Sequence, residues 1–477
     1  MRTMNRRRQN GLGILDENDQ FIPSSAPVQR GSRYASAGKY GRDVDKIKKA
    51  ILYHINNMNY VHVLCLSWLL LIYYGERWYP YHAIKKCQWP SFGPDDARIA
   101  LIADPQLVDA NTYPGRNWLF EKITEYIVDV YLRRNWVYMN SILDPDTNFF
   151  LGDLFDGGRE WDDKQWKKEF VRFTNIFTKP PYRRTVFSLP GNHDIGYGDT
   201  VVPHALERFQ TYFGPTSSSI DVANHTFVLL DTISMLNTIN STIYDPPKQF
   251  MKSIAEETDA KRRILLTHVP LFRSLEDSCG RQRESQKVIP YVRGYQYQTL
   301  VDPEITNSIL QSLEPMVIFS GDDHDACHVK HPFTNSVGRQ AMSEEFTVKS
   351  FSMAMGISMP GIQLLTLDSQ YSPQSTSPSY KTSICLMPSP YYPFLLYGLF
   401  AVVTLMAVYA YDVRPRLLPS KLRAFEKRER TEKGTPLPTS IKESPREQKK
   451  IPMIDDIFYI GLTVFVFMWF LGRSIFY

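Results

Sequence analysis

The sequence of 477 residues predicts an α/β fold joined to two or three transmembrane helices. Two observations support this prediction. Five short apolar segments have the character of buried strands, and helix-like stretches such as 118–137 and 161–177 separate them, as expected for an α/β architecture. Three long uncharged segments flank this region. The composition, with 43% hydrophobic and 22% charged residues, is ordinary for a globular protein.

The uncharged segments cover residues 51–75, 391–411 and 457–472. A spanning helix needs roughly 20 apolar residues, with Trp and Tyr favoured at its ends. We therefore expect transmembrane helices at 55–77, 391–411 and 455–473. The first is not a signal peptide, because a long polar leader precedes its apolar centre. The third is short, so a buried core helix remains an alternative there.

Positive charge is concentrated outside the α/β region, and this indicates an orientation. The net charge is only +5, but Lys and Arg crowd residues 1–49 and 414–450. Because cytosolic segments beside spans are enriched in these residues, we expect a basic, disordered cytosolic leader at 1–50 and a basic cytosolic loop at 412–452. Residues 80–388 then form a lumenal domain of the secretory pathway. No aromatic and basic module accompanies the basic ends, so nucleic-acid binding is not expected.

Two further features agree with a lumenal domain. Asn224 and Asn240 each lie in an N-x-Ser/Thr glycosylation sequence. Four of the five cysteines also lie in this region, and they permit two disulfides with three possible connectivities. We favour Cys87–Cys385, since both residues lie beside predicted spans, together with Cys279–Cys327.

Each of the five predicted strands runs into side chains that can bind a metal. The strands are expected at 98–103, 148–151, 185–189, 263–267 and 316–320. The residues that follow them include Asp104, Gln106, Asp153, Asp156, Asn192, His193, Asp194, His268, Asp322, Asp323 and His324. In open α/β sheets a site forms beyond the carboxyl ends of the strands. We therefore expect these side chains to meet at one place.

The types of side chain indicate a pair of divalent cations. Two cations roughly 3.5–4 Å apart need a carboxylate that bridges them, surrounded by oxygen and nitrogen ligands. Mixed Asp, Asn and His ligands suit Mn²⁺, Fe²⁺ or Zn²⁺. A structural zinc site would use closely spaced thiolates, and the sequence contains no Cys-x-x-Cys.

The motif series resembles the calcineurin-like metallophosphoesterase family. The resemblance covers residues 95–335 and implies an αββα two-sheet sandwich with a dinuclear metal site at one sheet edge. The positions that match metal ligands are Asp104, Gln106, Asp153, Asn192, His268, Asp322 and His324. Asp153 matches the bridging carboxylate. Asp104 and His324 match ligands of one cation.

The other positions match the second cation and the catalytic groups. Asn192, His268 and Asp322 match ligands of the second cation. His193 matches a histidine that contacts the phosphate or protonates the leaving group, and Asp194 is expected to orient it. Arg159 is expected either to contact the phosphate or to cap its own loop.

Two positions depart from the usual family pattern. Gln106 and Asp322 each replace a histidine. Gln106 can still coordinate through its carbonyl oxygen, and Asp322 is a good hard ligand. Because both changes exchange nitrogen for oxygen, they favour Mn²⁺ over Zn²⁺.

The motifs also resemble one membrane-bound branch of the family, the enzymes of the endoplasmic reticulum that remodel glycosylphosphatidylinositol (GPI) anchors. The matching segments are ADPQL (103–107), GDLFDGGR (152–159), PGNHDIG (190–196) and SGDDHDAC (320–327). This resemblance implies a manganese-dependent phosphodiesterase that removes ethanolamine phosphate from a mannose of the anchor. The expected partners are a GPI-anchored lipid or protein substrate and the membrane of the endoplasmic reticulum.

Two alternatives remain open. The chain could hydrolyse another lumenal lipid or a nucleotide phosphodiester. It could instead be a metal-binding cargo factor for GPI-anchored proteins with little turnover, an interpretation that rests on Gln106 and Asp322. Catalysis is favoured, because Asp153 and the Asn192-His193 pair are intact.

Overall fold

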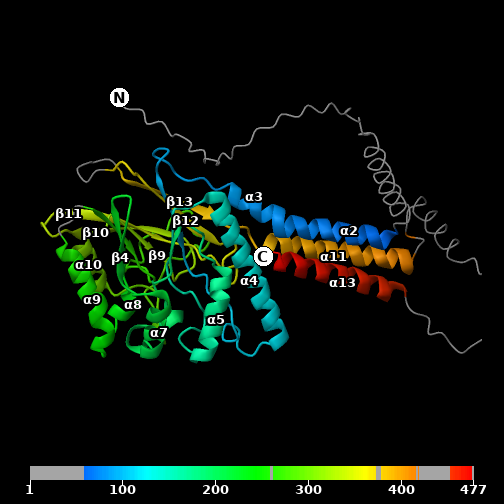
Figure 1. Cartoon of the computed structure of the whole chain (residues 1–477), viewed down its shortest axis with the longest axis horizontal. Helices are drawn as coiled ribbons and strands as arrows, with labels where there is room; N and C mark the ends of the chain where they lie inside the picture. The colour runs from blue at the N-terminus through cyan, green and yellow to red at the C-terminus, as the bar shows by residue number, and fades with distance from the viewer. Residues whose placement is uncertain (1–58, 258–260, 372–377, 415–416, 418–451, 475–477) are drawn as a thin grey trace, which may run out of the picture. The chain divides into compact units, whose positions relative to one another are not determined.

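The computed structural model describes residues 59–257, 261–371, 378–414, 417 and 452–474 (Figure 1). The predicted leader at 1–50 lies outside the described residues, as does nearly all of the loop predicted at 412–452. The described residues from Val61 onward belong to one compact unit.

Two mixed sheets form the centre of the predicted lumenal domain. The strand order is β13-β12-β1-β2-β3 in the five-stranded sheet and β10-β11-β9-β6-β5-β4 in the six-stranded sheet. The first sheet contains β1 (Ala97–Ile102), β2 (Thr147–Phe150), β3 (Arg184–Val186), β12 (Gly361–Leu367) and β13 (Tyr380–Leu386). The second contains β4 (Ser218–Val222), β5 (His225–Leu229), β6 (Arg262–Leu266), β9 (Val317–Ser320), β10 (Cys327–Thr334) and β11 (Gln340–Thr347).

The longer helices flank the two sheets, and short helices lie in the connections between strands (Figure 1). They are α4 (Trp118–Leu143), α5 (Asp163–Ile176), α6 (Asn192–Ile195), η2 (Gly198–Thr200), α7 (Pro203–Phe213), α8 (Thr232–Met235), α9 (Ser241–Glu256) and α10 (Pro303–Leu313). Local sequence explains where the longer ones start. The side chain of Asn117 accepts from the Leu119 amide at the start of α4, and Asp162 accepts from the Gln165 amide at the start of α5.

Alternation along the strands divides the core into two layers. Ile99 and Leu101 of β1 point between the sheets, where Phe149 stacks on Phe227 with ring centroids 4.7 Å apart. The intervening side chains, such as Ile102, point to the helices. The predicted αββα sandwich is therefore confirmed.

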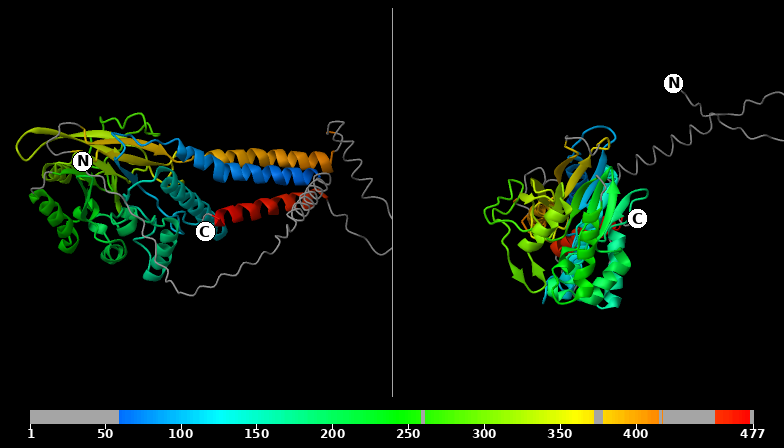
Figure 2. Two further views of the ribbon diagram at one scale, coloured as in Figure 1. Left: turned by 45° about the horizontal axis from the view of Figure 1, so that its top comes forward. Right: turned by 90° about the vertical axis from the view of Figure 1, so that its left-hand side faces the viewer.

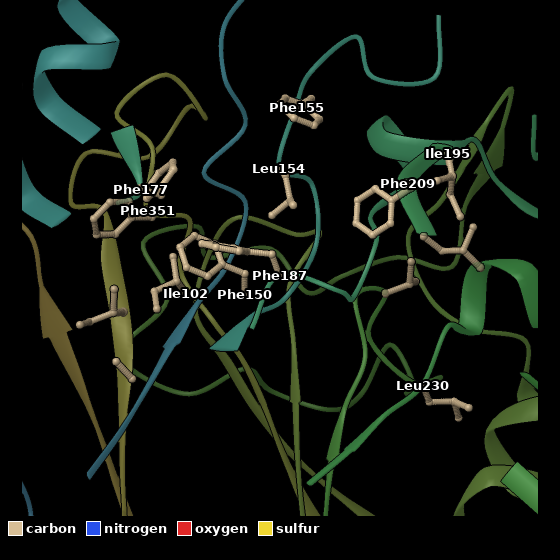
Figure 3. Close-up of a cluster of buried hydrophobic side chains, with 14 of the residues drawn as sticks. Ile102, Phe150, Leu154, Phe155, Phe177, Phe187, Ile195, Phe209, Leu230 and Phe351 are labelled. Atoms are coloured by element: carbon tan, nitrogen blue, oxygen red, sulfur yellow. The ribbon is translucent and has the colours of Figure 1, made fainter. Parts of the chain in front are cut away.

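An aromatic cluster fills the space between the five-stranded sheet and its helices (Figure 3). Phe150 at the end of β2 is fully buried, and its ring centroid lies 4.6 Å from that of Phe187. Trp136 of α4 and Phe177 also contact Phe150. This packing holds the carboxyl end of β2 in place, and β2 leads directly into the turn that contains Asp153.

All five predicted strands form, but they divide between the sheets. The strands β1, β2 and β3 run parallel in one sheet, and β6 and β9 run parallel in the other. Their polar turns still lie at a common edge of the sandwich, because ligand atoms from both sheets approach within 4.8 Å of one another.

The apolar segments form α2 (Tyr60–Tyr73), η1 (Tyr74–Trp78), α3 (Tyr79–Lys85), α11 (Tyr391–Asp412) and α13 (Pro452–Arg473). The helices α2, α11 and α13 lie side by side (Figure 2), and the Trp68 indole donates to the Thr404 hydroxyl at 3.0 Å. Within the described residues, α11 and Met453–Arg473 of α13 are long and apolar enough to cross a membrane. This fits a membrane protein.

One detail differs from the sequence-based expectations. The first apolar helix does not end at 77, because η1 and α3 continue it to Lys85, inside the domain predicted to start at 80. The third apolar segment forms a helix of 22 residues. Only 11% of its most apolar 18-residue stretch is buried, which argues against the alternative of a buried core helix.

Both favoured disulfides are present. Cys87 pairs with Cys385, which joins the segment after α3 to β13. Cys279 pairs with Cys327, which fastens the loop after β6 to the start of β10. Among the cysteines that the structure describes, Cys65 in α2 is free and buried.

Replacing Phe150 with Ala should destabilise the domain, because it opens a cavity in the aromatic cluster behind the β2 turn. We expect a loss of about 3–5 kcal/mol in the free energy of unfolding, measured by denaturation in detergent. Tyr182→Ala is the control, since that side chain is fully exposed. Equal stability of the two variants would contradict the assigned role of the cluster.

Candidate metal centre

The candidate ligands lie in tight turns with an unusual backbone conformation. Five of them have a positive φ: Asp104 (48°), Gln106 (35°), Asp153 (49°), Asp322 (66°) and His324 (67°). This left-handed conformation is about 1–2 kcal/mol less favourable for residues other than Gly. Such strain persists where the surrounding structure imposes it, and it is typical of functional sites.

The turns bring together two groups of possible metal ligands that share one carboxylate. Asp104, Asp153 and His324 form the first group, and Asp153, His268 and Asp322 form the second. Within each group the ligand atoms lie within 4.8 Å of one another. Asp153 belongs to both groups, which is the arrangement that a bridging ligand requires.

His268 has one ring nitrogen directed at the second group. Its Nδ1 lies 2.7 Å from the Leu151 carbonyl oxygen and donates to it, which leaves Nε2 as the ligand atom. Nε2 lies 3.5 Å from Oδ1 of Asp153 and 3.5 Å from Oδ1 of Asp322. A cation bound between these atoms would have both nitrogen and oxygen ligands.

Asn192 adds an amide oxygen to the second group. Its Oδ1 lies 3.4 Å from Nε2 of His268. Its Nδ2 donates to the Gln296 carbonyl oxygen at 3.1 Å, and this bond fixes which end of the amide faces the ligands. Gln296 is in the turn of the hairpin formed by β7 (Arg293–Gly294) and β8 (Tyr297–Gln298), so this hairpin positions a candidate ligand.

Two buried oxygen atoms, one from Asp104 in the first group and one from Gln106, lack hydrogen-bond partners in the part of the chain that the structure describes and fit a cation. Oδ2 of Asp104 and Oε1 of Gln106 are both buried without a hydrogen-bond partner among the described residues. Nε2 of Gln106 donates to Asp156 at 3.1 Å, so the amide is held with its oxygen as the remaining group. An unpartnered buried oxygen is costly unless a ligand satisfies it.

The electrostatics of the site also favour bound cations. Burial raises the pKa of Asp104 well above its usual range, and although His268 lowers it, the carboxylates of Asp153 and Asp322 raise it further. Several carboxylates gathered in one buried place are unfavourable unless positive charge compensates them. Divalent cations would provide that charge.

Glycine allows two of the turns to approach closely. A Cβ atom on Gly191 would lie 2.0 Å from Oδ1 of Asp153, and one on Gly152 would lie 2.5 Å from Nδ1 of His268. Both distances are far shorter than van der Waals contact. The glycines of the motifs therefore serve to place Asp153 and His268 against neighbouring backbone.

His193 lies beside the shared carboxylate. Its backbone amide donates to Oδ1 of Asp153 at 2.9 Å, and its Nδ1 lies 2.7 Å from the carbonyl oxygen and 3.1 Å from Oδ1 of Asp156. Burial lowers the pKa of His193, but the carboxylates of Asp153 and Asp156 outweigh burial and raise it to about 9. The ring is partly exposed, as a substrate-facing group must be.

The expectation that Asp194 orients His193 is wrong. The Asp194 carboxylate accepts from the backbone amides of Leu154 at 3.1 Å, Phe155 at 3.1 Å and Gly191 at 2.8 Å. It therefore joins the turn after β2 to the turn after β3. Burial raises the pKa of Asp194 to about 7, and the charge of Asp153 adds to this effect.

Asp156 takes the orienting role instead. It is the second Asp of the Gly-Asp-x-x-Asp motif, so the sequence contained a signal for it. Asp194 directly follows His193 in the sequence, and for that reason it was expected to orient the ring. In the short helix α6, however, its side chain turns back to cap the backbone amide of Gly191.

Comparisons with known proteins agree with this geometry. The profile described as "Calcineurin-like phosphoesterase" matches residues 97–326. "Cell division control protein 1" of Saccharomyces cerevisiae is 46% identical over 406 residues, which cover 81% of this chain and 82% of that protein. The chain belongs to the calcineurin-like metallophosphoesterase family.

Animal relatives match at lower identity. "Metallophosphoesterase 1 homolog" of Caenorhabditis elegans is 26% identical, covering 76% of this chain and 92% of that protein. "Metallophosphoesterase 1 homolog" of Drosophila melanogaster is 27% identical, covering 64% and 80%. As a member of this family, the chain is a metal-dependent phosphoesterase, and the ligand groups around Asp153 are where its divalent cations would bind.

Arg159 of this metallophosphoesterase supports its own loop. Its guanidinium donates to the Asn192 carbonyl oxygen at 3.1 Å, and its backbone amide donates to the His193 carbonyl oxygen at 3.0 Å. The capping role is therefore present. Contact with a phosphate stays a prediction.

The two glycosylation sequences lie in a turn and at a helix start. Asn224 is exposed in the turn between β4 and β5. Asn240 caps α9, where its side chain accepts from the Thr242 amide at 3.1 Å. Glycosylation of either residue stays a prediction.

Asp156→Asn and Asp194→Asn should have different effects. Asp156→Asn removes the charge beside His193 but leaves the histidine in place. We therefore expect kcat on a phosphodiester to fall about 10–100-fold, less than the roughly 10²–10⁴-fold that a general acid itself contributes, with little change in stability. Asp194→Asn removes an acceptor for three backbone amides, so we expect unfolding to become easier by at least about 1–3 kcal/mol. Steady-state kinetics and thermal denaturation measure the two effects. An intact kcat in Asp156→Asn would refute its role.

Proposed function

We propose that the protein is a metal-dependent phosphodiesterase of the endoplasmic reticulum that removes ethanolamine phosphate from a mannose of GPI anchors. The cleavage would support maturation and export of GPI-anchored proteins. The observation that carries the hydrolytic part of this proposal is the Asp153 carboxylate shared by two ligand groups, with His193 beside it. The GPI substrate rests on the resemblance of the four motif segments to the anchor-remodelling branch.

The membrane helices support a substrate that is held in a bilayer. A lipid-anchored phosphodiester and an enzyme anchored in the same membrane meet at a high effective concentration. The lumenal orientation is supported by the basic segments on the other side of the spans and by the two disulfides, which form in oxidising compartments.

A pocket beside the β7–β8 hairpin supports a hydroxyl-rich substrate. It has a volume of about 280 Å³, and Tyr197, Lys248 and Arg293 are among the residues that line it. The Tyr197 hydroxyl is buried without a partner among the described residues, so a substrate hydroxyl would satisfy it. The hairpin turn connects this pocket to the site, because the Gln296 side chain donates to the Thr200 carbonyl while its own carbonyl accepts from Asn192.

Each residue would have a distinct role in hydrolysis. Divalent cations held by the seven candidate ligands would neutralise the phosphate charge and supply an activated water, and the oxygen-rich ligand set favours Mn²⁺. Asp156 fixes Nδ1 of His193, so Nε2 can give a proton to the departing sugar oxygen. Arg159 holds the His193 turn in place.

The deciding experiment follows release of ethanolamine phosphate from a purified GPI glycan. The protein is stripped of metal by a chelator and then reconstituted with Mn²⁺. We expect release to require Mn²⁺ and to fall by more than about 100-fold in Asp153→Asn, which removes one charge from the shared ligand. The matched control is Asp144→Asn, because Asp144 also has a positive φ but lies at the opposite end of β2.

The other outcomes separate the alternatives. Hydrolysis of a generic phosphodiester without release from the glycan would show that the substrate is another lipid or a nucleotide. Binding of Mn²⁺ without turnover of either compound would favour a metal-binding cargo factor. Identification of the product would show which mannose carries the scissile group.

A further inference from the structure

The first two turns of α4 expose an unusual number of large apolar side chains. The exposed fraction is 70% for Trp118, 49% for Leu119, 64% for Phe120 and 44% for Ile123. Exposed apolar groups this dense in a short segment mark an interaction surface. None of them takes part in the metal centre or the core.

The apolar residues continue a helical stripe. Leu119, Phe120 and Ile123 have the spacing of one helix face, and the same face continues at Tyr126, Ile127 and Val130. The charged Lys122 lies about 100° round the helix from Ile123, at the polar edge of the stripe, where it pairs with Glu125 at 2.7 Å. The first part of α4 is therefore amphipathic, although the helix later enters the protein core.

The inner part of this stripe contacts the ends of the candidate membrane helices. Tyr126, Ile127 and Val130 line a cavity together with Phe394 near the start of α11 and Leu471 near the end of α13. A Cβ atom on Gly472 would lie 2.0 Å from the Tyr126 hydroxyl, so α4 and α13 touch there. Both membrane helices have an end at this cavity, which therefore lies level with one face of the bilayer.

Polar contacts hold α4 at this position. Arg134 forms an ion pair with Glu76 of η1, and Glu76 also accepts from the Tyr397 hydroxyl of α11 at 3.0 Å. The Tyr131 hydroxyl donates to the Pro388 carbonyl at 2.8 Å, just before α11. These contacts involve the turns next to the exposed stripe, so its position relative to the membrane helices is defined.

We propose that residues 118–123 of α4 insert into the bilayer surface beside α13. At about 1.5 Å per residue, Ile123 and Leu119 lie only roughly 5 and 11 Å from Tyr126 along the helix, so they stay close to the membrane surface. A helix that lies in this surface buries its apolar face about 5–10 Å into the headgroup region. Trp is favoured at that depth. The ends of α11 and α13 already contact the inner part of this stripe. The bilayer around those helices would therefore extend over residues 118–123.

The insertion would fix the orientation of the catalytic domain. The second half of α4 belongs to the domain core, where Trp136 is buried against Phe150 and its indole donates to the Thr178 carbonyl at 2.9 Å. Phe150 precedes the turn that contains Asp153. One rigid helix of 26 residues thus connects the membrane surface with the packing behind the metal centre.

Site-directed spin labelling tests this proposal in the full chain. Single cysteines are introduced as Phe120→Cys, Ile123→Cys and Lys122→Cys in a Cys65→Ser background, and each is labelled with a nitroxide in phosphatidylcholine proteoliposomes. We expect labels at 120 and 123 to collide with oxygen several-fold more than with a water-soluble nickel chelate. Labels at 122, and at 182 in Tyr182→Cys, should show the opposite preference.

Two results would overturn the proposal. If labels at 120 and 123 meet the nickel chelate as freely as those at 122 and 182, this surface faces water. If they are shielded from both reagents, protein covers them, and the occupant is a second copy of the chain. Two test positions on the stripe guard against a local effect of one substitution.

Discussion

The placement of the Asp153 carboxylate is the constraint on which the rest of the site depends. It lies in the overlap of two ligand groups, and it also accepts from the His193 amide at 2.9 Å. This position requires a left-handed conformation at Asp153, in the turn after β2, and a glycine at 191, because a side chain at 191 would collide with the carboxylate. The stability of the fold thus holds the Asp153 carboxylate in a strained turn at the place where cations would bind.

Several parts of the molecule keep this carboxylate in place. Phe150 and its aromatic neighbours hold the end of β2, and Asp194 joins the turns on either side of the shared ligand. The hairpin carbonyl of Gln296 and the Leu151 carbonyl orient Asn192 and His268. The candidate ligands therefore have little freedom to move, which suits a site that holds metal ions in a fixed geometry.

Much of this arrangement could be predicted from the sequence, because each ligand directly follows a segment with the pattern of a buried strand. Asp104, Asp153 and His268 were expected to meet for that reason, and they do. The division of the strands between two sheets could not be derived from the strand pattern itself, which does not say which strands pair. The exchange of roles between Asp156 and Asp194 depends on how α6 directs one side chain, and residue order is a poor guide to that. From the sequence, residues 118–137 were predicted only as a crossover helix. The exposed apolar stripe at the start of α4 could not be predicted, because exposure depends on how the helix packs in the folded chain.

We propose that Asp153 would be shared by two cations, and electron paramagnetic resonance of the Mn²⁺-loaded protein tests this proposal most directly. We expect about two Mn²⁺ per chain with the spectrum of an exchange-coupled pair, and loss of the coupling in Asp153→Asn. A single uncoupled Mn²⁺ per chain, or coupling that survives this substitution, would contradict it.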